Sequence, residues 1–428
     1  MKILLLVLAV IASASAAKIS YRGYKLFNVA PQTEENVELL RELETEGAKT
    51  GVMFWKQGRV GRKADLIVPP SAVVWVSQAL REAKMRFNVT VEDVEDLLEK
   101  EASDNRLAHM KMSRQRSGQT YKSVLGTYAR HSAINDWLEN VANSYSSIAS
   151  TENIGSTYEG RTMKLIKIGS DGSNKPAIWL DAGIHAREWI APAVAEYIID
   201  QLTSRYASNS NIRKMVDDFD WYILPVANPD GYEYTHTNDR MWRKTRAPTN
   251  DYYCTGSDPN RNFDFHFGEA GTSSDPCSDT YPGPRPFSEK NTSNMRDKIN
   301  ALKSRLKMYL SLHAYSELWL TPWGYDSARP ADYIEMDRVA DIGVNALKAV
   351  HGKSFQRGTP PAILYAASGG SYDWAKGVAD VKYSYTLELR PGNDCSWFCN
   401  GFVLDSSQII PSGEEIFAAV EAVVNAMQ

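Results

Sequence analysis

The sequence predicts a large α/β domain, whose mixed and mostly parallel sheet is buried between helices, preceded by a small α+β open sandwich. From residue 117 onward, near-continuous apolar runs alternate with helical patterns, which is typical of a sheet covered on both faces. Between residues 18 and 102, short strands alternate with amphipathic helices, which suits helices packed on one face of a small sheet. A chain of 428 residues has room for both units, since one to three domains are expected at this length.

Composition narrows the class of protein further. The chain is 43% hydrophobic and 23% charged, as expected for a globular protein. Its formal net charge is −4 and its isoelectric point is about 6.0, so there is no electrostatic case for binding nucleic acid or an anionic membrane. A polyanionic substrate is equally unexpected.

Residues 1–17 have the layout of a signal peptide. Lys2 precedes an apolar run of about ten residues, and the small residues Ala14, Ala16 and Ala17 follow it. A buried terminal helix is the alternative, but the run is too short to span a bilayer and it ends in serine and alanine. We therefore expect this segment to be removed and the protein to be secreted into the extracellular space.

The small domain is expected to span residues 18–116, including a cleavable linker at its end. It contains neither histidine nor cysteine between residues 18 and 102, which argues against metal chemistry there. The helix predictions rest on apolar spacing of three, as in Val37, Leu40 and Leu43. Strands are predicted at residues 24–29, 52–55, 64–70 and 85–91, and helices at residues 33–47, 72–84 and 91–103.

The segment 109–123 reads HMKMSRQRSGQTYKS and predicts a polar, basic linker. Its residues Lys111, Arg114 and Arg116 suit cleavage by a trypsin-like protease, because nicking concentrates in exposed loops of small and polar residues. A small domain, a cleavable linker and a large domain together suggest a zymogen, with a plain two-domain protein as the alternative.

The large domain is expected to span residues 117–428. Four apolar runs predict buried strands, and several segments between them have helical spacing. Open α/β sheets bind ligands beyond the carboxyl ends of their strands, so the residues that close each run are the candidates for chemistry. Strands are predicted at residues 177–183, 221–229, 306–314 and 383–389, and helices at residues 191–206, 294–304, 332–350 and from 411 onward.

Two of these strand ends predict a metal site. His185 and Glu188 follow the first run, and His313 closes the third. A catalytic zinc takes three protein ligands and keeps a fourth position open, so His313 is the best candidate for the missing donor. The other histidines are assigned to less suitable places: His109 to the linker, His131 to a polar helix start, His236 and His266 to polar loops, and His351 to a helix end.

Glu388 lies within the fourth apolar run, where a buried carboxylate must be paired or functional. Arg390 is its candidate ion-pair partner. Beside a zinc-bound water, Glu388 would instead be a general base, because the metal lowers the pKa of the water and a carboxylate can accept its proton.

Secretion makes disulfides the expected state of the cysteines. Four cysteines allow three pairings, of which the two local bridges are the simplest. Sequons at Asn88 and Asn291 fit glycans and unmodified surface asparagines about equally well. The cysteines are Cys254, Cys277, Cys395 and Cys399.

Five motifs in register resemble the secreted zinc metallocarboxypeptidases of the A and B types. The resemblance covers nearly the whole chain, because the region before residue 117 resembles the inhibitory activation domain of the same enzymes. It implies a carboxypeptidase-like fold, a zymogen of the digestive type, and removal of C-terminal residues from peptides. The motifs are HAREW at 185–189, NRNFD at 260–264, HAYSE at 313–317, YAASGGSYDW at 365–374 and TLELR at 386–390.

Carried over residue by residue, the resemblance makes His185, Glu188 and His313 the ligands of one zinc ion. It makes Glu388 the base that activates the zinc-bound water. Arg243 matches the arginine that polarises the scissile carbonyl, a role that suits a fixed cation in a water-poor site. A solvated basic surface is the alternative for this arginine.

The same resemblance implies how the substrate is held. Asn260 and Arg261 match the pair that binds the terminal carboxylate, which a guanidinium can grip through two parallel hydrogen bonds. Tyr365 matches a mobile tyrosine that closes over this carboxylate. Further substrate contacts are implied for Arg187, Arg240 and Tyr315. For the first of these three, an ordinary surface salt bridge is the alternative.

Tyr372 is the matched floor of the specificity pocket, where B-type enzymes carry an acid and A-type enzymes an aliphatic residue. A tyrosine offers no counter-charge and is bulky, which favours neutral C-terminal residues and apolar ones first. A register shift that turned Asp373 inward would favour lysine and arginine instead. The matched pocket walls are Leu320, Gly324, Ala367 and Thr386.

The resemblance also bears on disulfides and partners. It implies a bridge between Cys254 and Cys277, which leaves Cys395 and Cys399 to clamp the loop 391–402, a loop longer than expected for the family. This loop is predicted to alter the access of protein protease inhibitors. The expected partners are peptide substrates and a trypsin-like activating protease, and the protein is expected to be a monomer. The competing function is a non-catalytic, zinc-dependent peptide-binding protein.

Overall fold

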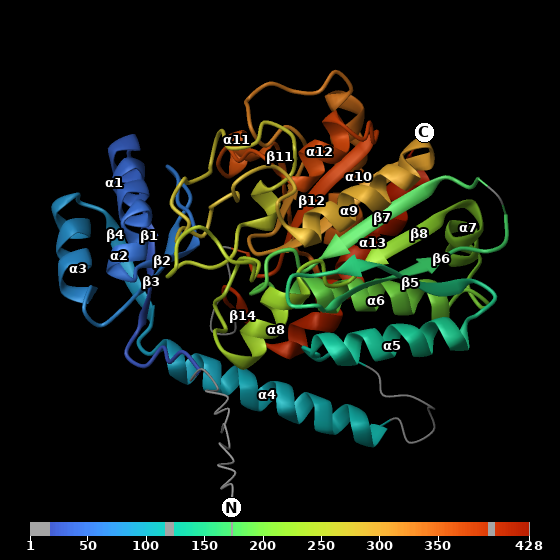
Figure 1. The fold of residues 1–428 in the computed structure, drawn as a ribbon, viewed down its shortest axis with the longest axis horizontal. Coiled ribbons are helices and arrows are strands. Elements are labelled where there is room, and N and C mark those ends of the chain that lie inside the picture. The colour runs from blue at the N-terminus through green and yellow to red at the C-terminus, as the bar shows by residue number, and fades with distance from the viewer. Residues whose placement is uncertain (1–17, 116–123, 173, 393–398, 428) are drawn as a thin grey trace, which may run out of the picture.

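The computed structural model describes residues 18–115, 124–172, 174–392 and 399–427. A small domain, blue in Figure 1, lies beside a large domain that contains a long sheet. The helix α4 (Val94–Gln115) runs from the small domain along the lower side of the large one in this view. Among the described residues, no helix is both long and apolar enough to cross a membrane. The predicted signal peptide lies outside the described residues.

The small domain is a four-stranded antiparallel sheet with helices packed on one face. The strand order is β2 (Met53–Lys56), β3 (Ala64–Val68), β1 (Lys25–Ala30) and β4 (Arg86–Val91). The helices are α1 (Glu34–Thr45), α2 (Gly47–Thr50) and α3 (Val73–Glu82). The core joins Phe27 of the sheet to Leu40 and Leu80 of the helices. The helix α1 begins where Thr33 accepts a hydrogen bond from the backbone N–H of Asn36. The predicted α+β open sandwich is confirmed.

The helix α4 corrects the predicted linker. The sequence predicts a helix that ends near residue 103 and a polar loop from residue 109, but one helix continues to Gln115. No glycine or proline interrupts this stretch. Asn105 also anchors the helix to the large domain, because its side chain exchanges two hydrogen bonds of 2.9 Å with the backbone of Tyr128.

The same helix carries two of the residues predicted for cleavage. Lys111, which is exposed, and Arg114 lie on its last turns, so they are not in a loop as predicted. Arg116 and the rest of the predicted linker lie outside the described residues.

The large domain is built on an eight-stranded mixed sheet. The strand order is β11 (Gln356–Gly358), β10 (Leu318–Leu320), β12 (Tyr383–Leu389), β9 (Leu306–Ala314), β7 (Ala177–Ala182), β8 (Asp220–Leu224), β6 (Thr162–Ile168) and β5 (Ala149–Ser156). Four neighbouring pairs are parallel and three are antiparallel, so the predicted sheet is confirmed. The four strands predicted from apolar runs form its centre. The other four were missed, because β5 and β6 lack a continuous apolar run and β10 and β11 have three residues each.

Helices cover both faces of this sheet (Figure 1). One face is covered by α5 (His131–Ser144), α6 (Ile190–Ser204), α7 (Ser210–Asp218), α10 (Tyr333–His351) and α13 (Ile409–Ala426), and the other by α9 (Lys290–Leu302) and α12 (Ser371–Gly377). Adjacent residues of β7 point into the two separate cores, Ile178 into the first and Trp179 into the second. Burial on both faces explains why the central strands are continuous apolar runs.

Three interpretations of single residues change. His131 is buried at the start of α5, with its Nε2 atom 3.0 Å from the carbonyl oxygen of Thr162, and burial lowers the pKa of its imidazole to about 4. His236 lies in the helix α8 (Pro229–Thr237) and stacks on Trp189, so it is not in a loop. Asn291 is buried and its side-chain amide donates to a backbone carbonyl at 3.0 Å, which favours the unmodified form.

Candidate active site

The sheet brings two predicted metal-binding segments to the same edge. β7 ends at Ala182, and the chain then turns through His185 and Glu188 before α6 begins. β9 is the parallel neighbour of β7, and Leu312 lies opposite Ala182. His313 follows Leu312 directly. Because parallel strands end at one edge of a sheet, His313 meets the turn after β7.

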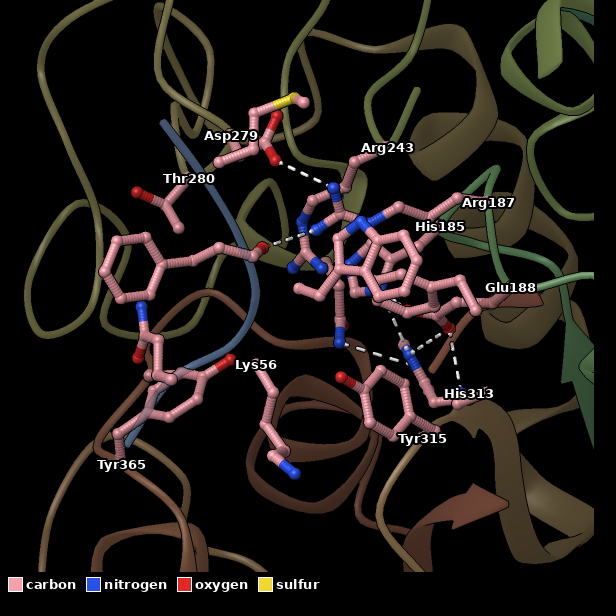
Figure 2. A pocket seen from close by; sticks show the side chains of 18 of the residues that line it. Lys56, His185, Arg187, Glu188, Arg243, Asp279, Thr280, His313, Tyr315 and Tyr365 are labelled. Atoms are coloured by element: carbon pink, nitrogen blue, oxygen red, sulfur yellow. Dashed lines mark hydrogen bonds and ion pairs between the residues drawn. The ribbon is translucent and has the colours of Figure 1, made fainter. Parts of the chain in front are cut away.

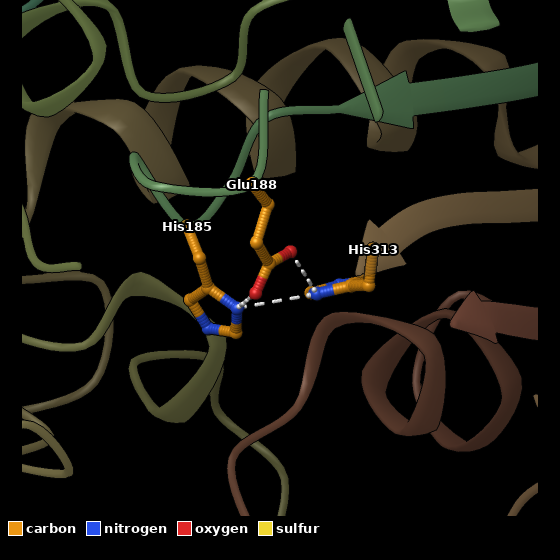
Figure 3. A group of neighbouring side chains, drawn as sticks. All are labelled: His185, Glu188 and His313. Carbon is orange, nitrogen blue, oxygen red and sulfur yellow. Dashed lines mark hydrogen bonds and ion pairs between the residues drawn. The ribbon is translucent and has the colours of Figure 1, made fainter. Parts of the chain in front are cut away.

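The side chains of His185, Glu188 and His313 converge on one point (Figure 3). The two Nδ1 atoms lie 3.2 Å apart, and the carboxylate oxygens of Glu188 lie 2.7 Å from His185 Nδ1 and 3.2 Å from His313 Nδ1. Two nitrogens bound to one tetrahedral zinc, each at about 2.0–2.1 Å, would lie about 3.3 Å apart. Burial opposes the charge of Glu188, but the two histidines lower the pKa of its carboxyl group. The spacing and the donor set therefore fit zinc.

Asp258 orients the first of these ligands. Its Oδ1 atom lies 3.1 Å from Nε2 of His185, which leaves Nδ1 directed at the cluster. Its Oδ2 atom accepts hydrogen bonds of 3.1 and 2.8 Å from the guanidinium of Arg243. Burial alone would raise the pKa of Asp258, but Arg243 and His185 hold it well below its usual range. Sequence reasoning missed Asp258, although its place two residues before Asn260 was an available signal.

Glu388 lies beside the cluster. It is the direct neighbour of His313 in the parallel pair of β12 and β9. Burial raises the pKa of Glu388 to about 7, against the opposing effect of His313. The alternative ion pair with Arg390 is wrong, because the Nε atom of Arg390 donates to Glu415 at 2.9 Å. A carboxylate beside a metal cluster, with this pKa, is a candidate general base.

Arg243, Asn260 and Arg261 line the same cavity. The side chain of Arg243 is only 10% exposed, so the alternative of a solvated surface is wrong. Burial would lower the pKa of this arginine, but the carboxylate of Asp258 raises it overall. Asn260 is held by the backbone N–H of Ser371, which donates to its Oδ1 at 2.9 Å. The Nε atom of Arg261 donates to the carbonyl of Gly271 at 2.9 Å, so all three side chains are held before any ligand arrives.

The cavity has a volume of about 300 Å³ and lies between the two domains. β2 of the small domain forms one of its walls. Figure 2 shows Lys56 of this strand between Tyr365 and Tyr315. Asp65 of the small domain accepts a hydrogen bond of 2.6 Å from the hydroxyl of Tyr315 and lies 2.9 Å from the ammonium of Lys56. The small domain therefore engages one of the predicted substrate contacts.

The connection between β2 and β3 reaches the segment that carries Tyr365. Arg59 and Arg62 donate to the backbone carbonyls of residues 362–363, the second at 2.7 Å. The charge of Arg62 also lowers the pKa of Glu388, although burial outweighs it. The sequence predicted no site residue in the small domain, because the residues next to these arginines in the chain do not indicate which segment the arginines contact.

Arg187 and Arg240 were both predicted to contact substrate. Arg187 lines the cavity, where its contact with substrate stays a prediction, and its buried side chain also forms an ion pair of 3.0 Å with Asp279. The structure does not bring Arg240 to the cavity. Its guanidinium is paired with Glu101 of α4 at 2.7 and 2.8 Å and lies 3.7 Å from the centre of the Trp189 ring.

The cavity extends beside Arg261 into the predicted specificity pocket. Asp373 is buried, and its carboxylate accepts the backbone N–H of Gly324 at 2.8 Å. The register shift that would turn Asp373 toward the substrate is therefore absent. Gly324, a predicted wall of the pocket, is not among the described residues that line the cavity. The predicted pocket residues that line the cavity are Leu320, Ala367, Tyr372 and Thr386.

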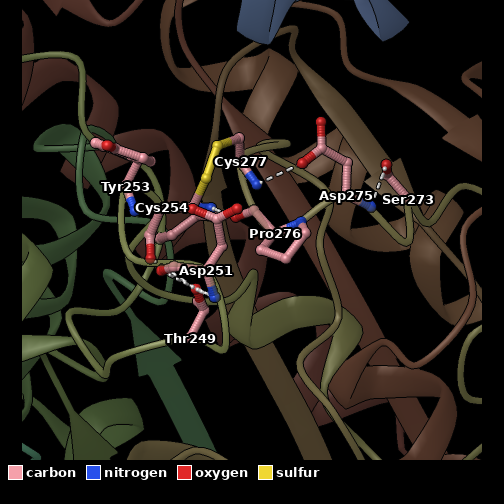
Figure 4. The surroundings of a disulfide bond; sticks show 9 residues. Thr249, Asp251, Tyr253, Cys254, Ser273, Asp275, Pro276 and Cys277 are labelled. Atoms are coloured by element: carbon pink, nitrogen blue, oxygen red, sulfur yellow. Dashed lines mark hydrogen bonds between the residues drawn. A yellow bond between two sulfur atoms is a disulfide. The ribbon is translucent and has the colours of Figure 1, made fainter.

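Cys254 and Cys277 form a disulfide whose Cα atoms lie 4.8 Å apart (Figure 4). The local pairing is confirmed for this bridge, which borders the cavity because Cys277 lines it. Cys395 lies outside the described residues, and with it the predicted bridge to Cys399.

Residues 134–419 match the family described as zinc carboxypeptidase, and residues 27–101 match the carboxypeptidase activation peptide. The chain belongs to the zinc carboxypeptidase family. As a zinc carboxypeptidase with an activation peptide, it is a peptide hydrolase made as a zymogen. The small domain is its activation domain.

Carboxypeptidases of both types are similar to this one. Carboxypeptidase B of Astacus astacus is 48% identical over 300 residues, which is 70% of this chain and 96% of the relative. Carboxypeptidase A2 of Mus musculus is 37% identical, over 95% of this chain and 94% of the relative. The crystal structure of carboxypeptidase A from Helicoverpa armigera has a TM-score of 0.87 at 27% identity, over 96% of this chain and 98% of that one. Because both types occur among the relatives, the match does not decide which residue is released.

Proposed function

We propose that the chain is a secreted carboxypeptidase that uses one zinc ion to hydrolyse the C-terminal peptide bond of peptides and releases neutral residues, as A-type enzymes do. The observation that carries the proposal is the cluster of His185, Glu188 and His313 beside Glu388, in the cavity that also holds Arg261. A candidate metal site, a base and a carboxylate anchor thus share one cavity.

The two imidazoles and the carboxylate suit zinc, because they leave the fourth tetrahedral position open. Bound zinc supplies a Lewis acid that polarises a carbonyl and lowers the pKa of water to about 7. Glu388 is placed to take the proton from the attacking water and to return it to the departing amine. A carboxyl group with a pKa of about 7 suits this exchange, since it can both accept and release a proton near neutral pH.

Two arginines serve the two places where the substrate carries negative charge. Arg243 is held by Asp258 in a buried position, which suits a charge that develops on the carbonyl oxygen only during reaction. Arg261 and Asn260 suit the terminal carboxylate, which is present from the start. Tyr365 is half-buried and follows the short helix α11 (Pro360–Ile363), so it can close over that carboxylate. Because this anchor binds a free carboxylate, it explains why only C-terminal residues would be removed.

The specificity proposal rests on the absence of an acid from the lining beside Tyr372 among the described residues. The nearest carboxylate, that of Asp373, is bonded to the backbone of Gly324. The test is to treat the protein with trypsin and assay blocked dipeptides that end in Phe, Leu, Lys or Glu, with and without a chelator. If no residue is released in a chelator-sensitive way, the enzyme proposal fails. Preferential release of lysine would reject the A-type assignment in favour of the B type.

The zymogen is proposed to be activated by trypsin-like cleavage at the end of α4, at Lys111, Arg114 or Arg116. Cleavage there would separate the activation domain (residues 18–116) from the catalytic domain (residues 117–428). The support is that β2 forms a wall of the cavity, so the docked activation domain occupies space beside the predicted substrate-binding residues. N-terminal sequencing of the activated protein would identify the cut.

The competing function, a non-catalytic zinc-dependent peptide-binding protein, would need the cluster but neither Glu388 nor Arg243. Both side chains line the cavity, which favours the enzyme. Secretion and the monomeric state are tested by recovery from culture medium and by light scattering. The loop 391–402 is proposed to restrict protein inhibitors, and an unchanged inhibition constant after shortening the loop would contradict this.

A further inference from the structure

We infer that Tyr372 closes the far end of the specificity pocket, so that this carboxypeptidase releases small neutral residues such as alanine and valine in preference to leucine and phenylalanine. The inference rests on the proposed function and names its substrate class. It depends on how the tyrosine ring is seated, which neither the family match nor the sequence decides.

The pocket lies where the side chain of a C-terminal residue must go. Arg261 and Asn260 anchor the carboxylate end, and Asn260 is hydrogen-bonded to the backbone of Ser371 at the start of α12. Leu320 and Thr386 are direct partners in the antiparallel pair of β10 and β12, so their side chains share one face and form one wall of the cavity. A residue held at Arg261 therefore directs its side chain between this wall and α12.

The ring of Tyr372 lies close to Gly370, two residues before it, and its hydroxyl lies close to Gly324 in a distant part of the chain. A Cβ atom added at Gly370 would lie 3.4 Å from Cε1 of the ring, and one added at Gly324 would lie 2.3 Å from its hydroxyl oxygen. A side chain at position 370 would thus be in van der Waals contact with the ring, and the hydroxyl fits only because position 324 is glycine. Tyr372 is 5% exposed, so almost all of its surface is already packed.

Hydrogen bonds hold Tyr372 and its two neighbours, and the ring itself is packed over almost all of its surface, so it cannot swing away easily. The N–H of Ser371 donates to Asn260, and the carboxylate of Asp373 accepts the N–H of Gly324 at 2.8 Å. The carbonyl of Tyr372 itself accepts a hydrogen bond of 2.7 Å from the hydroxyl of Ser384. Three consecutive residues are therefore held by three separate segments.

A pocket shortened by a fixed ring discriminates by size. One misplaced methylene in an apolar pocket changes the specificity constant by roughly 10- to 200-fold, and a fixed ring gives larger side chains no room to adjust. The other lining residues, Leu320, Ala367 and Thr386, carry no charge. The substrate class that fits is a short, uncharged C-terminal side chain.

The test compares kcat/KM of the activated enzyme and two variants for blocked dipeptides that end in Ala, Val, Leu, Phe or Lys. We expect the wild type to prefer Ala and Val over Phe by at least roughly tenfold. The variant Tyr372→Ile, which removes the ring, should raise the Phe to Ala ratio by at least roughly tenfold. The variant Tyr372→Phe, which keeps the ring, should retain the wild-type ratio.

The inference is wrong if the wild type hydrolyses the Phe substrate as fast as the Ala substrate. It is also wrong if the variant Tyr372→Ile still hydrolyses the Ala substrate but has the same Phe to Ala ratio as the wild type. Should Tyr372→Ile lose all hydrolysis, the wild-type ratio and the variant Tyr372→Val decide the matter. A preference for Lys would mean that the negative charge of Asp373 acts on the pocket through the tyrosine hydroxyl. This result would also reject the inference. Absence of any chelator-sensitive release would overturn the proposed function, and this inference with it.

Discussion

The buried ion pair between Glu101 and Arg240 is predicted to hold the activation domain on the catalytic domain. Glu101 lies on α4, and its two carboxylate oxygens accept hydrogen bonds of 2.7 and 2.8 Å from the guanidinium of Arg240. The side chains are 5% and 3% exposed, respectively. We therefore expect the substitution Glu101→Gln to weaken the docking of the two domains strongly.

The magnitude follows from the contacts that remain. Removal of one partner of a buried ion pair costs about 3–5 kcal/mol. Arg240 keeps its hydrogen bonds to the backbone carbonyls of Arg187 and Phe402 and its contact with the Trp189 ring, so we take the lower figure, about 3 kcal/mol. Each 1.4 kcal/mol is a factor of ten, so the population of undocked activation domain should rise by about 100-fold.

The assay is hydrolysis of a blocked dipeptide by the uncleaved protein. Uncleaved Glu101→Gln should hydrolyse it about 100-fold faster than uncleaved wild type, or as fast as activated enzyme if that limit is lower. Asp96→Asn on the same helix is the matched control, because Asp96 pairs with Arg22 within the activation domain and both are exposed. It should behave as wild type.

Activation itself supplies an internal check. Cleavage after α4 removes residue 101, so both zymogens should give activated enzymes with equal kcat/KM. Equal values would show that the catalytic domain of the variant is folded. If uncleaved Glu101→Gln is then as inactive as wild type within a factor of about three, the reasoning about docking is refuted.

Three further predictions concern the base, the buried histidine and the disulfide. Glu388→Gln should lower kcat by roughly 10²–10⁴-fold while the zinc content measured by atomic absorption stays the same, and a fall of less than tenfold would contradict the assignment of the base. His131 binds its proton less readily when folded, with a pKa of about 4 against an ordinary 6.5, so it contributes stability above pH 6.5 that is lost as the pH falls through 4. The wild type should therefore lose up to about 3 kcal/mol more unfolding free energy than His131→Gln across this window, and parallel curves in denaturant titrations would contradict this. Replacement of both Cys254 and Cys277 by serine should lower the unfolding free energy by about 3 kcal/mol, because the bridge closes a loop with a separation of 23 residues, and a change below about 1 kcal/mol would show that the loop is held by other contacts.

The order of local patterns predicted the central part of the fold and the candidate metal ligands. The strands that carry or precede His185, His313 and Glu388 are continuous apolar runs, because both faces of the sheet are buried, and this leaves a clear signal in the chain. The polar strand β5 and the short strands β10 and β11 leave no such signal. Their pairing depends on neighbours that the chain supplies elsewhere.

The ion-pair partners of charged side chains could not be predicted from the sequence. Arg390 lies two residues from Glu388, yet it pairs with Glu415. The resemblance implied that Arg240 contacts the substrate, and in the structure its guanidinium pairs with Glu101 of the activation domain. In both cases the partner is far away in the chain, so no local pattern could identify it.

The sequence by itself determined that this is a zinc carboxypeptidase with an activation domain. Three of its five motifs, HAREW, HAYSE and TLELR, lie at strand ends whose positions follow from local hydrophobic patterns. Only the tertiary structure decided that Asp373 is bonded to Gly324, that Asp65 of the activation domain engages Tyr315, and that the hydroxyl of Tyr372 lies against Gly324. These outcomes depend on the distances between segments brought together by packing, which are set by the whole folded chain and not by the residues next to each site.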